Sequence, residues 1–343
     1  MGVTSHDVAK LAGVSQPTVS RALRGERNVS DETREKVLRA ARELSYVPSE
    51  TGRSLSTRST QRIGLVADDL TNPFYPQLVQ PLRDHLERSG YRTLLIADHV
   101  DEPVEIERLA DGSLDGVILT TTLLGSSLPR ELKARGIACV LANREVADLV
   151  VDTVTVDNRA GAAQAARLLA DLGHRRVAAI LGPHDTSTGR DREVGFREEL
   201  AARGIPLPAH LVRRGEFTFE AGYDAVTDLL TVPSPPTAVF CGNDVIAMGA
   251  RCAAAALGRE VPRELTLLGF DDIAMAGWEV FALTSVHCDL TAMAGHAVRL
   301  LMDRIKEPAK DAEHVVLTPT LTLRRTHAAP EHTLTSSEDG PGR

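Results

Sequence analysis

The stretch from Val3 to Leu55 limits most strongly what this chain can fold into, because it combines short amphipathic helices with one sharp turn. Gly13 is expected to end the first helix, since glycine adopts a left-handed turn conformation without steric cost. Ser15 suits the N-cap of the next helix, and Pro17 suits its first turn, where a backbone N–H has no helical partner. The apolar face of this second helix consists of Val19, Ala22 and Leu23. The pattern predicts a helix-turn-helix, whose second helix enters the major groove of DNA, although a plain helical hairpin shares the same outline.

A third helix is expected in the segment VSDETREKVLRAARELSYVP. Ser30 suits its N-cap, and Asp31 and Glu32 suit the positive N-terminal end of the helix. Its apolar stripe is expected to consist of Val37, Leu38, Ala41 and Leu44. Pro48 closes the unit, so we expect residues 1–48 to form a headpiece of three helices that can fold alone.

The composition suggests a large protein of two or three domains with few aromatic residues. The chain has 343 residues, of which 3% are aromatic, so its core must be built mainly of Ala, Val, Leu and Ile. No apolar run approaches the ~20 residues of a membrane span, and the N-terminus lacks an apolar signal core. We therefore expect a cytoplasmic protein that does not bind membranes. The cysteines, which lack CxxC spacing and are expected to be buried thiols, are Cys139, Cys241, Cys252 and Cys288.

The net charge of −8 is divided unevenly along the chain. Residues 1–61 contain ten basic and seven acidic residues, which leaves this segment at +3. The remaining residues contain 29 basic and 40 acidic residues, which leaves them at −11. A basic N-terminal segment can approach the phosphates of DNA, whereas the acidic remainder is repelled by them.

From Ile63 onward, short apolar strands alternate with helices, which predicts parallel sheets covered on both faces. The pattern restarts near residue 159, so two similar subdomains are expected. Strands are expected near residues 63–67, 93–97, 115–120, 138–143, 153–157, 176–182, 211–217, 237–242 and 265–270. Helices are expected at residues 74–88, 104–110, 160–172, 190–203, 244–256 and 292–305, before Gly136 and before Leu230.

Polar side chains follow most of these strands, at the sheet edge where ligands bind in such folds. They are Asp68, Asp69, Asn72, Asn143, Arg144, Asp157, Asn158, Thr188, Arg190, Arg192, Asn243, Asp244, Asp271 and Asp272, with aromatic rings at Phe74, Tyr75, Phe217 and Phe219. Carboxylates, amides and arginines beside aromatic faces suit a polyhydroxylated ligand such as a sugar. Capping of the following helix is the alternative role, and it suits Asn158, Asp244 and Asp272 best.

The order of the motifs GVSQPTVSRAL, VSDETREKVLRAARELSYVP and IGLV resembles the LacI–GalR family of transcriptional repressors over nearly the whole chain. The resemblance implies a helix-turn-helix headpiece, a hinge at residues 49–61 and a two-lobed, periplasmic-binding-protein-like α/β effector domain. It also implies a homodimer that binds a pseudo-palindromic DNA operator and is controlled by a small-molecule effector. The helix at residues 292–305 would return to the first subdomain, and EHVVLTPTLTLRR would close both sheets.

The resemblance places DNA contacts on the second helix and the hinge. Gln16, Pro17 and Arg21 would contact bases, although Arg21 could equally contact phosphate alone. Thr18 and Ser20 would lie at the phosphate backbone, and Ser15 is also counted among the DNA-binding residues. Leu55 would be the hinge leucine that wedges into the minor groove. Gly52 replaces the family's usual alanine, so we expect this hinge to become helical less readily. Equal exchange protection of the hinge in a Gly52→Ala variant on specific DNA would refute this expectation.

The same resemblance assigns the effector contacts. The motifs GRDREVGF and LGFDD place an arginine and an aspartate role on Arg192 and Asp271. The other positions that match the pocket are Asp69, Phe74, Asn143, Phe217 and Asn243. Asn143 replaces a common aspartate, so the effector chemistry can differ, because an amide donates as well as accepts hydrogen bonds. A carbohydrate effector is expected, and a nucleobase or nucleoside between Phe74 and Phe217 is the alternative.

The domains are expected to be a headpiece (1–48), a hinge (49–61), an effector domain (62–329) and a disordered tail (330–343). The two subdomains of the effector domain would be 62–158 with 289–320, and 159–288 with 321–329. An enzyme is not expected, because GxGxxG, GxxxxGK[ST], GxSxG and HExxH motifs are absent and the histidines are dispersed. No cofactor or metal site is expected, and His174 is interpreted as a helix-end group. A solute-binding protein would share the two-lobed body but would not need the headpiece.

Overall fold

The computed structural model describes residues 3–23, 26, 28–46, 59–67, 70–97, 104–148 and 150–331. The chain divides into two compact units, Met1–Gln61 and Arg62–Arg343. The predictions for Gly52, Leu55 and Asp69, and for most of the tail, fall outside the described residues.

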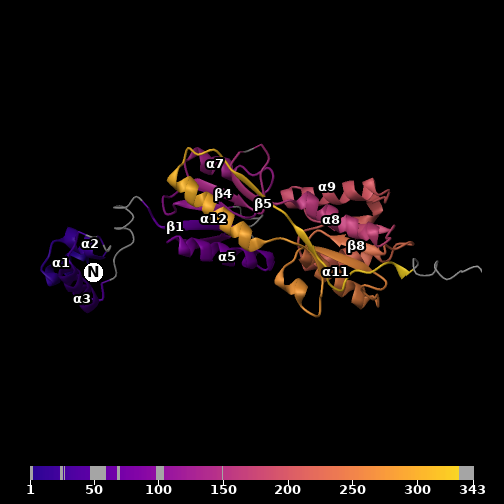
Figure 1. The fold of residues 1–343 in the computed structure, drawn as a ribbon, viewed down its shortest axis with the longest axis horizontal. Coiled ribbons are helices and arrows are strands. Elements are labelled where there is room, and N and C mark those ends of the chain that lie inside the picture. Colours follow the sequence, from indigo (N-terminus) through magenta and orange to yellow (C-terminus); the bar gives the residue numbers. More distant parts are fainter. Residues whose placement is uncertain are drawn as a thin grey trace, which may run out of the picture. The chain divides into compact units, whose positions relative to one another are not determined.

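The N-terminal unit contains three helices: α1 (Ser5–Ala12), α2 (Gln16–Leu23) and α3 (Asp31–Glu43) (Figure 1). Gly13 ends α1 with φ of 67°, and Thr4 with Asp7 forms a capping box at its start. The side chain of Ser30 accepts a hydrogen bond from the backbone of Thr33 and so caps α3 as expected. The small core of this unit consists of Val8, Ala9, Val19, Ala22, Val29, Val37, Ala40 and Ala41.

One residue of the expected apolar stripe of α3 lies on the wrong face. Leu38 is 40% exposed, whereas Ala40 is 4% exposed and packs in the core. With 3.6 residues per turn, residues 37, 40, 41 and 44 share one face of a helix, and residue 38 lies beside it. The prediction placed Leu38 in the core, but the helical period decided which side chain is buried.

The first lobe of the C-terminal unit is a parallel sheet of six strands in the order β11-β5-β4-β3-β1-β2. Its strands are β1 (Arg62–Ala67), β2 (Arg92–Ala97), β3 (Gly116–Leu119), β4 (Ala138–Ala142), β5 (Asp152–Val156) and β11 (His314–Leu317). Its helices are α5 (Phe74–Arg88), α6 (Ile106–Leu109), α7 (Leu128–Ala134) and α12 (Leu290–Lys306). α12 packs against α5 and against the strands of this sheet (Figure 1).

The second lobe repeats the arrangement with the strand order β12-β10-β9-β8-β6-β7. Its strands are β6 (Val177–Leu181), β7 (Val212–Arg214), β8 (Ala238–Cys241), β9 (Thr266–Asp271), β10 (Thr284–His287) and β12 (Thr320–Thr322). Its α-helices are α8 (Asn158–Asp171), α9 (Ser187–Ala202), α10 (Phe219–Leu229) and α11 (Asp244–Ala256). Two 3-10 helices, η1 (Ala209–Leu211) and η2 (Ala274–Gly277), also lie in this lobe. Only β12 runs antiparallel to its neighbour in this sheet.

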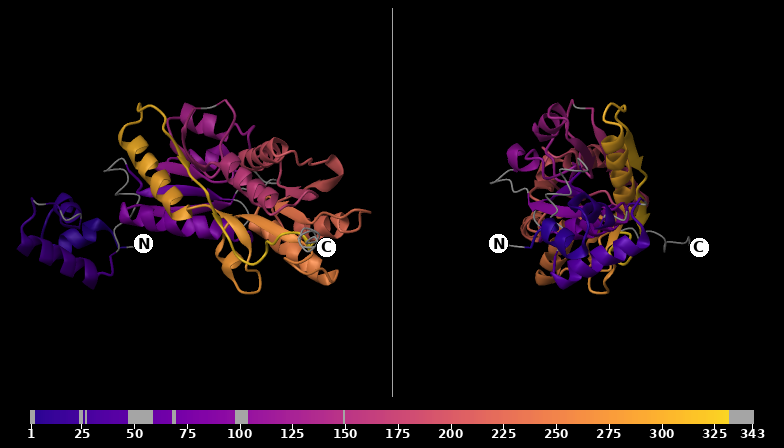
Figure 2. Two further views of the ribbon diagram at one scale, coloured as in Figure 1. Left: turned by 45° about the vertical axis from the view of Figure 1, so that its right-hand side comes forward. Right: turned by 90° about the vertical axis from the view of Figure 1, so that its left-hand side faces the viewer.

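The described chain passes between the lobes after β5, after β10 and between β11 and β12. The last passage is visible as the yellow segment that leaves the first lobe and joins the sheet of the second (Figure 2). The expected two-lobed α/β fold is therefore confirmed.

Two elements differ from the expectation. β10 was not expected, because its sequence TSVH is short and polar, although its first three residues are buried. The helix predicted at residues 104–110 is only one turn long, as α6.

Two further expectations concern single side chains and membranes. Three cysteines are buried, but Cys252 on α11 is partly exposed, so the prediction was wrong for that residue. Among the described helices, none combines the length and apolarity that crossing a membrane requires.

Candidate functional site

In the N-terminal unit, α2 turns a short polar face outward. Val19 and Ala22 are buried against α1 and α3, whereas Pro17 and Arg21 are exposed and lie one turn apart. Ser15 caps α2, because its Oγ accepts a hydrogen bond from the backbone N of Thr18 at 3.3 Å. The exposed face therefore offers an apolar ring and a guanidinium group to a surface outside the protein.

Gln16 is held by a neighbour in the same unit. Its Nε2 donates to Ser5 Oγ at 3.2 Å, and the pair is partly buried. A base contact from Gln16 would have to exchange this hydrogen bond, whereas Arg21 is exposed in this structure. Thr18 and Ser20 are partly buried beside them.

In the C-terminal unit, six of the seven residues predicted to bind an effector line one small cavity between the lobes. Five of its lining residues come from the first lobe and five from the second, where they lie on α9, before α10, directly before α11 and on β9. The lining residues are Asn72, Phe74, Tyr75, Asn143, Arg144, Thr188, Arg192, Phe217, Asn243 and Asp271. They lie together because the carboxyl ends of the parallel strands in both sheets face this cleft.

Arg192 on α9 is the most heavily bonded side chain of the cleft. It is 4% exposed, and its Nη2 donates to Asp271 Oδ1 at 2.7 Å. Its Nε donates to Asn158 Oδ1 at 2.8 Å and its Nη1 to the carbonyl of Gly242 at 2.7 Å. Its guanidinium carbon also lies 3.8 Å from the centre of the Phe270 ring. These contacts hold the planar fork in one orientation before any ligand arrives.

Burial raises the pKa of two carboxyl groups at the cleft, those of Asp271 and Asp244. Desolvation raises the pKa of Asp271, and the positive charge of Arg192 offsets part of this effect. Behind it, desolvation raises the pKa of Asp244 well above its usual range, and the charge of Asp271 adds to the shift. Asp271 also adopts a left-handed φ of 104°, which is strained for a residue with a side chain.

Local backbone features place the remaining side chains. Asn143 follows β4 with φ of 73°, a conformation that asparagine tolerates better than most residues. Phe217 packs directly over Gly182, where even a Cβ atom would lie 2.1 Å from the ring. A larger residue at position 182 would therefore displace the aromatic ring from the cavity.

The structure corrects the three predicted caps. The side chain of Asp157 caps α8, and Asn158 instead accepts the hydrogen bond from Arg192. The side chain of Asn243 caps α11 while also lining the cavity.

Asp244 accepts instead from Ser285 and from the backbone of Ile273, beneath β9. Asp272 pairs with Arg324 on the C-terminal segment at 2.6 Å. A cap needs only local geometry, whereas these partners come from distant parts of the chain.

Arg144, Tyr75 and Asn72 also line the cavity; they were expected among the polar and aromatic residues at the strand ends, but the family resemblance did not assign them an effector contact. Arg144 is 6% exposed, and donates to Tyr75 OH at 3.2 Å and to the carbonyl of Thr121 at 3.0 Å. Its position directly after Asn143, at a strand end, was the available signal.

Hydrogen bonds across the cleft hold the two lobes together. The bonded pairs are Asn72 Nδ2 with Phe217 O, Leu124 N with Asp185 O, Glu145 N with Ser187 Oγ, and Ala274 N with Gln77 Oε1. An exposed ion pair, Arg190 with Glu145 at 3.1 Å, adds to them. The central cavity is correspondingly small, about 20 Å³, which is space for roughly one water molecule.

His174 serves the second lobe as a structural group. Its two ring nitrogens bond to Thr237 Oγ1 at 2.8 Å and to the carbonyl of Ala328 at 2.9 Å. Burial lowers its pKa. The residue ties the C-terminal segment to the lobe and does not line the central cavity.

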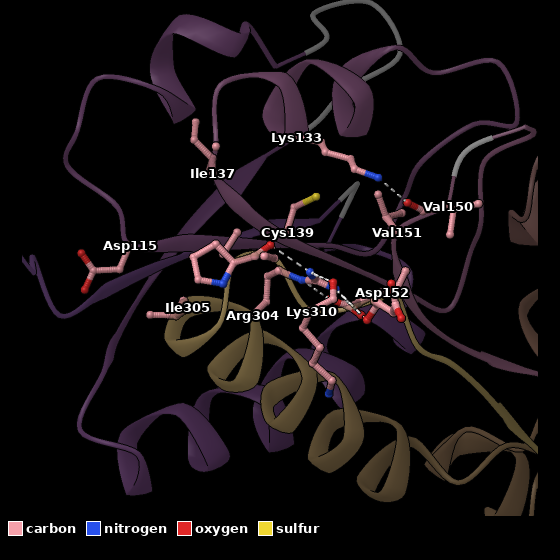
Figure 3. Close-up of a pocket in the computed structure, with 16 residues that line it drawn as sticks. Asp115, Lys133, Ile137, Cys139, Val150, Val151, Asp152, Arg304, Ile305 and Lys310 are labelled. Atoms are coloured by element: carbon pink, nitrogen blue, oxygen red, sulfur yellow. Dashed lines mark hydrogen bonds and ion pairs between the residues drawn. The ribbon is translucent and has the colours of Figure 1, made fainter.

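A second cavity of about 510 Å³ lies in the first lobe, at the amino ends of β4 and β5 beside α12 (Figure 3). None of the predicted DNA or effector residues lines it. Arg304 pairs with Asp152 there, and Lys133 Nζ donates to the carbonyl of Val150 at 2.9 Å. Burial raises the pKa of the Cys139 thiol in its wall to about 11. These charged groups satisfy one another within the protein.

Comparison with protein families identifies both units. Residues 4–49 match the bacterial regulatory proteins of the lacI family, and residues 166–327 match a periplasmic binding protein-like domain.

Several relatives match over nearly the whole chain. An HTH-type transcriptional repressor PurR from Erwinia tasmaniensis is 35% identical over 331 residues, which cover 95% of this chain and 97% of the relative. The ribose operon repressor of Haemophilus influenzae is 34% identical over 325 residues, with coverage of 94% and 97%. The structure of a transcriptional regulator CelR–cellobiose complex aligns with a TM-score of 0.72 at 34% identity, covering 94% of this chain and 99% of that one. The chain therefore belongs to the LacI–GalR family of DNA-binding transcriptional repressors, with a helix-turn-helix headpiece and a two-lobed, periplasmic-binding-protein-like core.

Proposed function

We propose that this chain acts as a homodimeric repressor whose affinity for a pseudo-palindromic operator changes when a sugar binds between the lobes of its core. The observation that carries the proposal is the pre-oriented Arg192–Asp271 pair among amide and aromatic side chains at the facing strand ends. The ribose operon repressor and the cellobiose-bound CelR among the similar proteins support a carbohydrate as the effector class. Because its target is DNA, we place the protein in the cytoplasm.

The headpiece supplies the DNA contacts in this proposal. Arg21 and Pro17 on the exposed face of α2 would meet base edges, and Gln16 would join them by releasing Ser5. Ser15, Thr18 and Ser20 would contact phosphates, and Leu55 would insert into the minor groove. Residues 1–48 would form the headpiece and residues 49–61 the hinge, with the two subdomains divided as the sequence predicts.

Effector binding in the core would be coupled to DNA binding through a movement of the two lobes. An effector larger than one water molecule requires the cleft to widen, so the lobe-to-lobe hydrogen bonds must rearrange around it. A change in lobe angle in each protomer alters the spacing of two hinges in a dimer. The effector would thereby shift operator affinity by linkage, in either direction.

The decisive test measures operator binding and effector response in the full chain. Selection from random duplexes should yield a pseudo-palindromic site that binds with strong salt dependence. Fluorescence anisotropy on that site should then change when a member of a sugar panel is added. If no duplex is preferred, or if only a nucleobase or nucleoside changes the affinity, the proposal fails in its DNA part or its sugar part respectively.

A further inference from the structure

A large cavity of about 890 Å³ opens between the lobes, next to the small central one. Arg144 lines both cavities, so the two spaces meet at its side chain. The first lobe contributes the loop after β3 and the start of α6, and the second lobe contributes Pro183, Asp185, Thr186 and Glu216. Every contributing loop follows the carboxyl end of a strand, as the central cavity's loops do.

Two buried polar groups in this wall lack a hydrogen-bond partner among the described residues. They are Thr122 Oγ1 and Arg144 Nε, on side chains that are 5% and 6% exposed. A buried polar atom without a partner is unfavourable, so both groups would gain a hydrogen bond from a ligand hydroxyl once the wall shifts enough to admit it. Thr122 lines the large cavity but not the central one, so it marks a second contact point.

The charges at the cavity restrict what can enter. Carboxylates line it at Glu105, Glu107, Glu131, Asp185 and Glu216, and the basic group in its wall is the buried Arg144. Arg135 lies beside two of these carboxylates, 3.8 Å from Glu107 and 3.5 Å from Glu131. One basic side chain beside the cavity and one in its wall leave a net negative charge among the lining residues. A phosphorylated or acidic sugar would be repelled there.

The volume sets the size of the ligand. A space of about 890 Å³ lies near the upper end of the roughly 300–1,000 Å³ typical of small-molecule sites. A single sugar ring that contacts Arg192 and Asp271 would leave most of this space, including the Thr122 hydroxyl, without contact. A chain of sugar rings would extend from the central residues past Arg144 to Thr122.

We propose that the effector is an uncharged oligosaccharide of at least two units, with one ring at Arg192 and Asp271 and the next beside Arg144 and Thr122. This inference rests on the proposed sugar response and adds the length and charge of the ligand. The central residues recognise the first ring, and the outer cavity selects for the second.

Differential scanning fluorimetry and calorimetry of the full chain test the inference with defined probes. The panel contains ribose, glucose and galactose, then cellobiose, maltose, lactose and cellotriose, and finally glucose 6-phosphate and adenine. At least one uncharged di- or trisaccharide is expected to bind ten or more times more tightly than its monosaccharide, and glucose 6-phosphate is expected not to bind. Tightest binding of a monosaccharide, a phosphate ester or adenine, or no binding of any oligosaccharide in the panel, overturns the inference.

Substitutions at the outer cavity separate its contribution from that of the central site. Gly125 borders the cavity, and a Cβ atom built there meets nothing within 4 Å, so this position accepts a side chain, and Gly125→Trp is designed to place an indole ring in the space. This variant should lose the advantage of the disaccharide and keep the affinity for the monosaccharide, whereas Gly125→Ala should bind both as the parent chain does. Thr122→Val removes one hydroxyl with little change in shape, and should weaken the disaccharide alone by about tenfold.

The two proposals fail in different ways. If a monosaccharide changes operator affinity and Gly125→Trp behaves like Gly125→Ala, the regulatory function stands and the oligosaccharide inference is wrong. If oligosaccharides bind with the expected selectivity but operator affinity never changes, the binding inference stands and the proposed regulation is wrong.

Discussion

Two buried arginine–aspartate pairs in the core look alike in distance but differ in how completely they are bonded. Arg192 and Asp271 meet at 2.7 Å in the cleft, and Arg304 and Asp152 meet at 2.8 Å at the opposite edge of the first sheet. Both aspartates are almost fully buried. From the contrast between them we infer which ion pair holds the fold together and which one meets a ligand.

In the Arg304–Asp152 pair, both carboxylate oxygens and all three guanidinium nitrogens have hydrogen-bond partners within the protein, and we call such a pair saturated. Arg304 reaches both carboxylate oxygens, at 2.8 and 3.1 Å, and the backbone N of Glu313 donates to the same carboxylate at 2.9 Å. The guanidinium group also donates to carbonyls of the segment that connects α12 to β11, at Pro308, Lys310 and Asp311. The pair therefore fastens this segment to β5, although a cavity of about 510 Å³ lies beside it (Figure 3).

The Arg192–Asp271 pair is not saturated in this way. Arg192 bonds to only one oxygen of Asp271, and its other donors go to Asn158 and Gly242. The aspartate sits on a strained backbone, and burial raises its pKa. Strain and incomplete bonding are typical of sites that bind ligands, whereas full bonding is typical of structural sites. The large cavity beside the saturated pair does not change this conclusion.

The largest effect on stability is expected from breaking the saturated pair. Arg304→Met leaves the Asp152 carboxylate buried without its partner, which should lower the free energy of unfolding by about 3–5 kcal/mol. Urea unfolding of the full chain measures the loss, and the sugar response should persist under native conditions. The double variant Asp152→Leu/Arg304→Met removes both charges and should recover most of the loss. A cost below about 1 kcal/mol for Arg304→Met would make the two pairs equivalent and break the comparison.

A smaller loss of stability but a larger loss of function is expected at Arg192. Arg192→Ala should abolish the effector response and leave operator binding intact, with an unfolding cost of about 1–3 kcal/mol, because Asp271 can bind a proton once the arginine is gone. Anisotropy with and without sugar gives the response. Arg192→Lys keeps the charge without the planar fork, and should also lose most of the response. If operator binding disappears together with the sugar response, Arg192 supports the fold rather than the ligand.

The two sites should respond to pH with opposite signs. Asp271 and Asp244 have raised pKa values, so their contribution to stability is fully present below the unfolded value of 3.8 and is lost as pH rises through the folded value. Glu313, beside Arg304, has a pKa lowered to about 2 by hydrogen bonds with Arg299 and Lys310. Its contribution is present above 4.5 and is lost as pH falls towards 2.

Unfolding curves measured from pH 3 to pH 7 can separate these contributions. In Asp244→Asn, the free energy of unfolding should fall less as pH rises towards 7. In Glu313→Gln, it should fall less as pH drops towards 3. The comparison would be wrong if both substitutions changed the same side of the profile.

The smallest effect is expected at an arginine–carboxylate pair that is not buried. Arg190 and Glu145 bridge the lobes at 3.1 Å, but their side chains are 38% and 39% exposed. Glu145→Gln should therefore change the free energy of unfolding by less than about 0.5 kcal/mol. A larger change in chemical unfolding would show that burial does not separate the three pairs. Glu145→Asp serves as the control that keeps the charge.

The sequence by itself determined the elements and most members of the cleft. Hydrophobic period and end signals such as Gly13 and Ser30 specified the helices, because these features act within one turn of the chain. The motifs around Arg192 and Asp271, and the polar residues at the strand ends, indicated six side chains that line one cavity. All strand ends of parallel sheets point the same way, so a local pattern was sufficient for that prediction.

Only the tertiary structure decided how the polar residues divide between capping, support and the cavity. Asp244 meets Ser285, 41 residues away, and Arg304 meets Asp152, 152 residues away, so no local pattern contains either partner. The same holds for Arg144 and Thr122, because the cavity beside their unpartnered atoms is lined by residues of both lobes. Side-chain partners of this kind are set by the packing of whole elements, because burial and distance depend on residues that the chain brings together only after it folds.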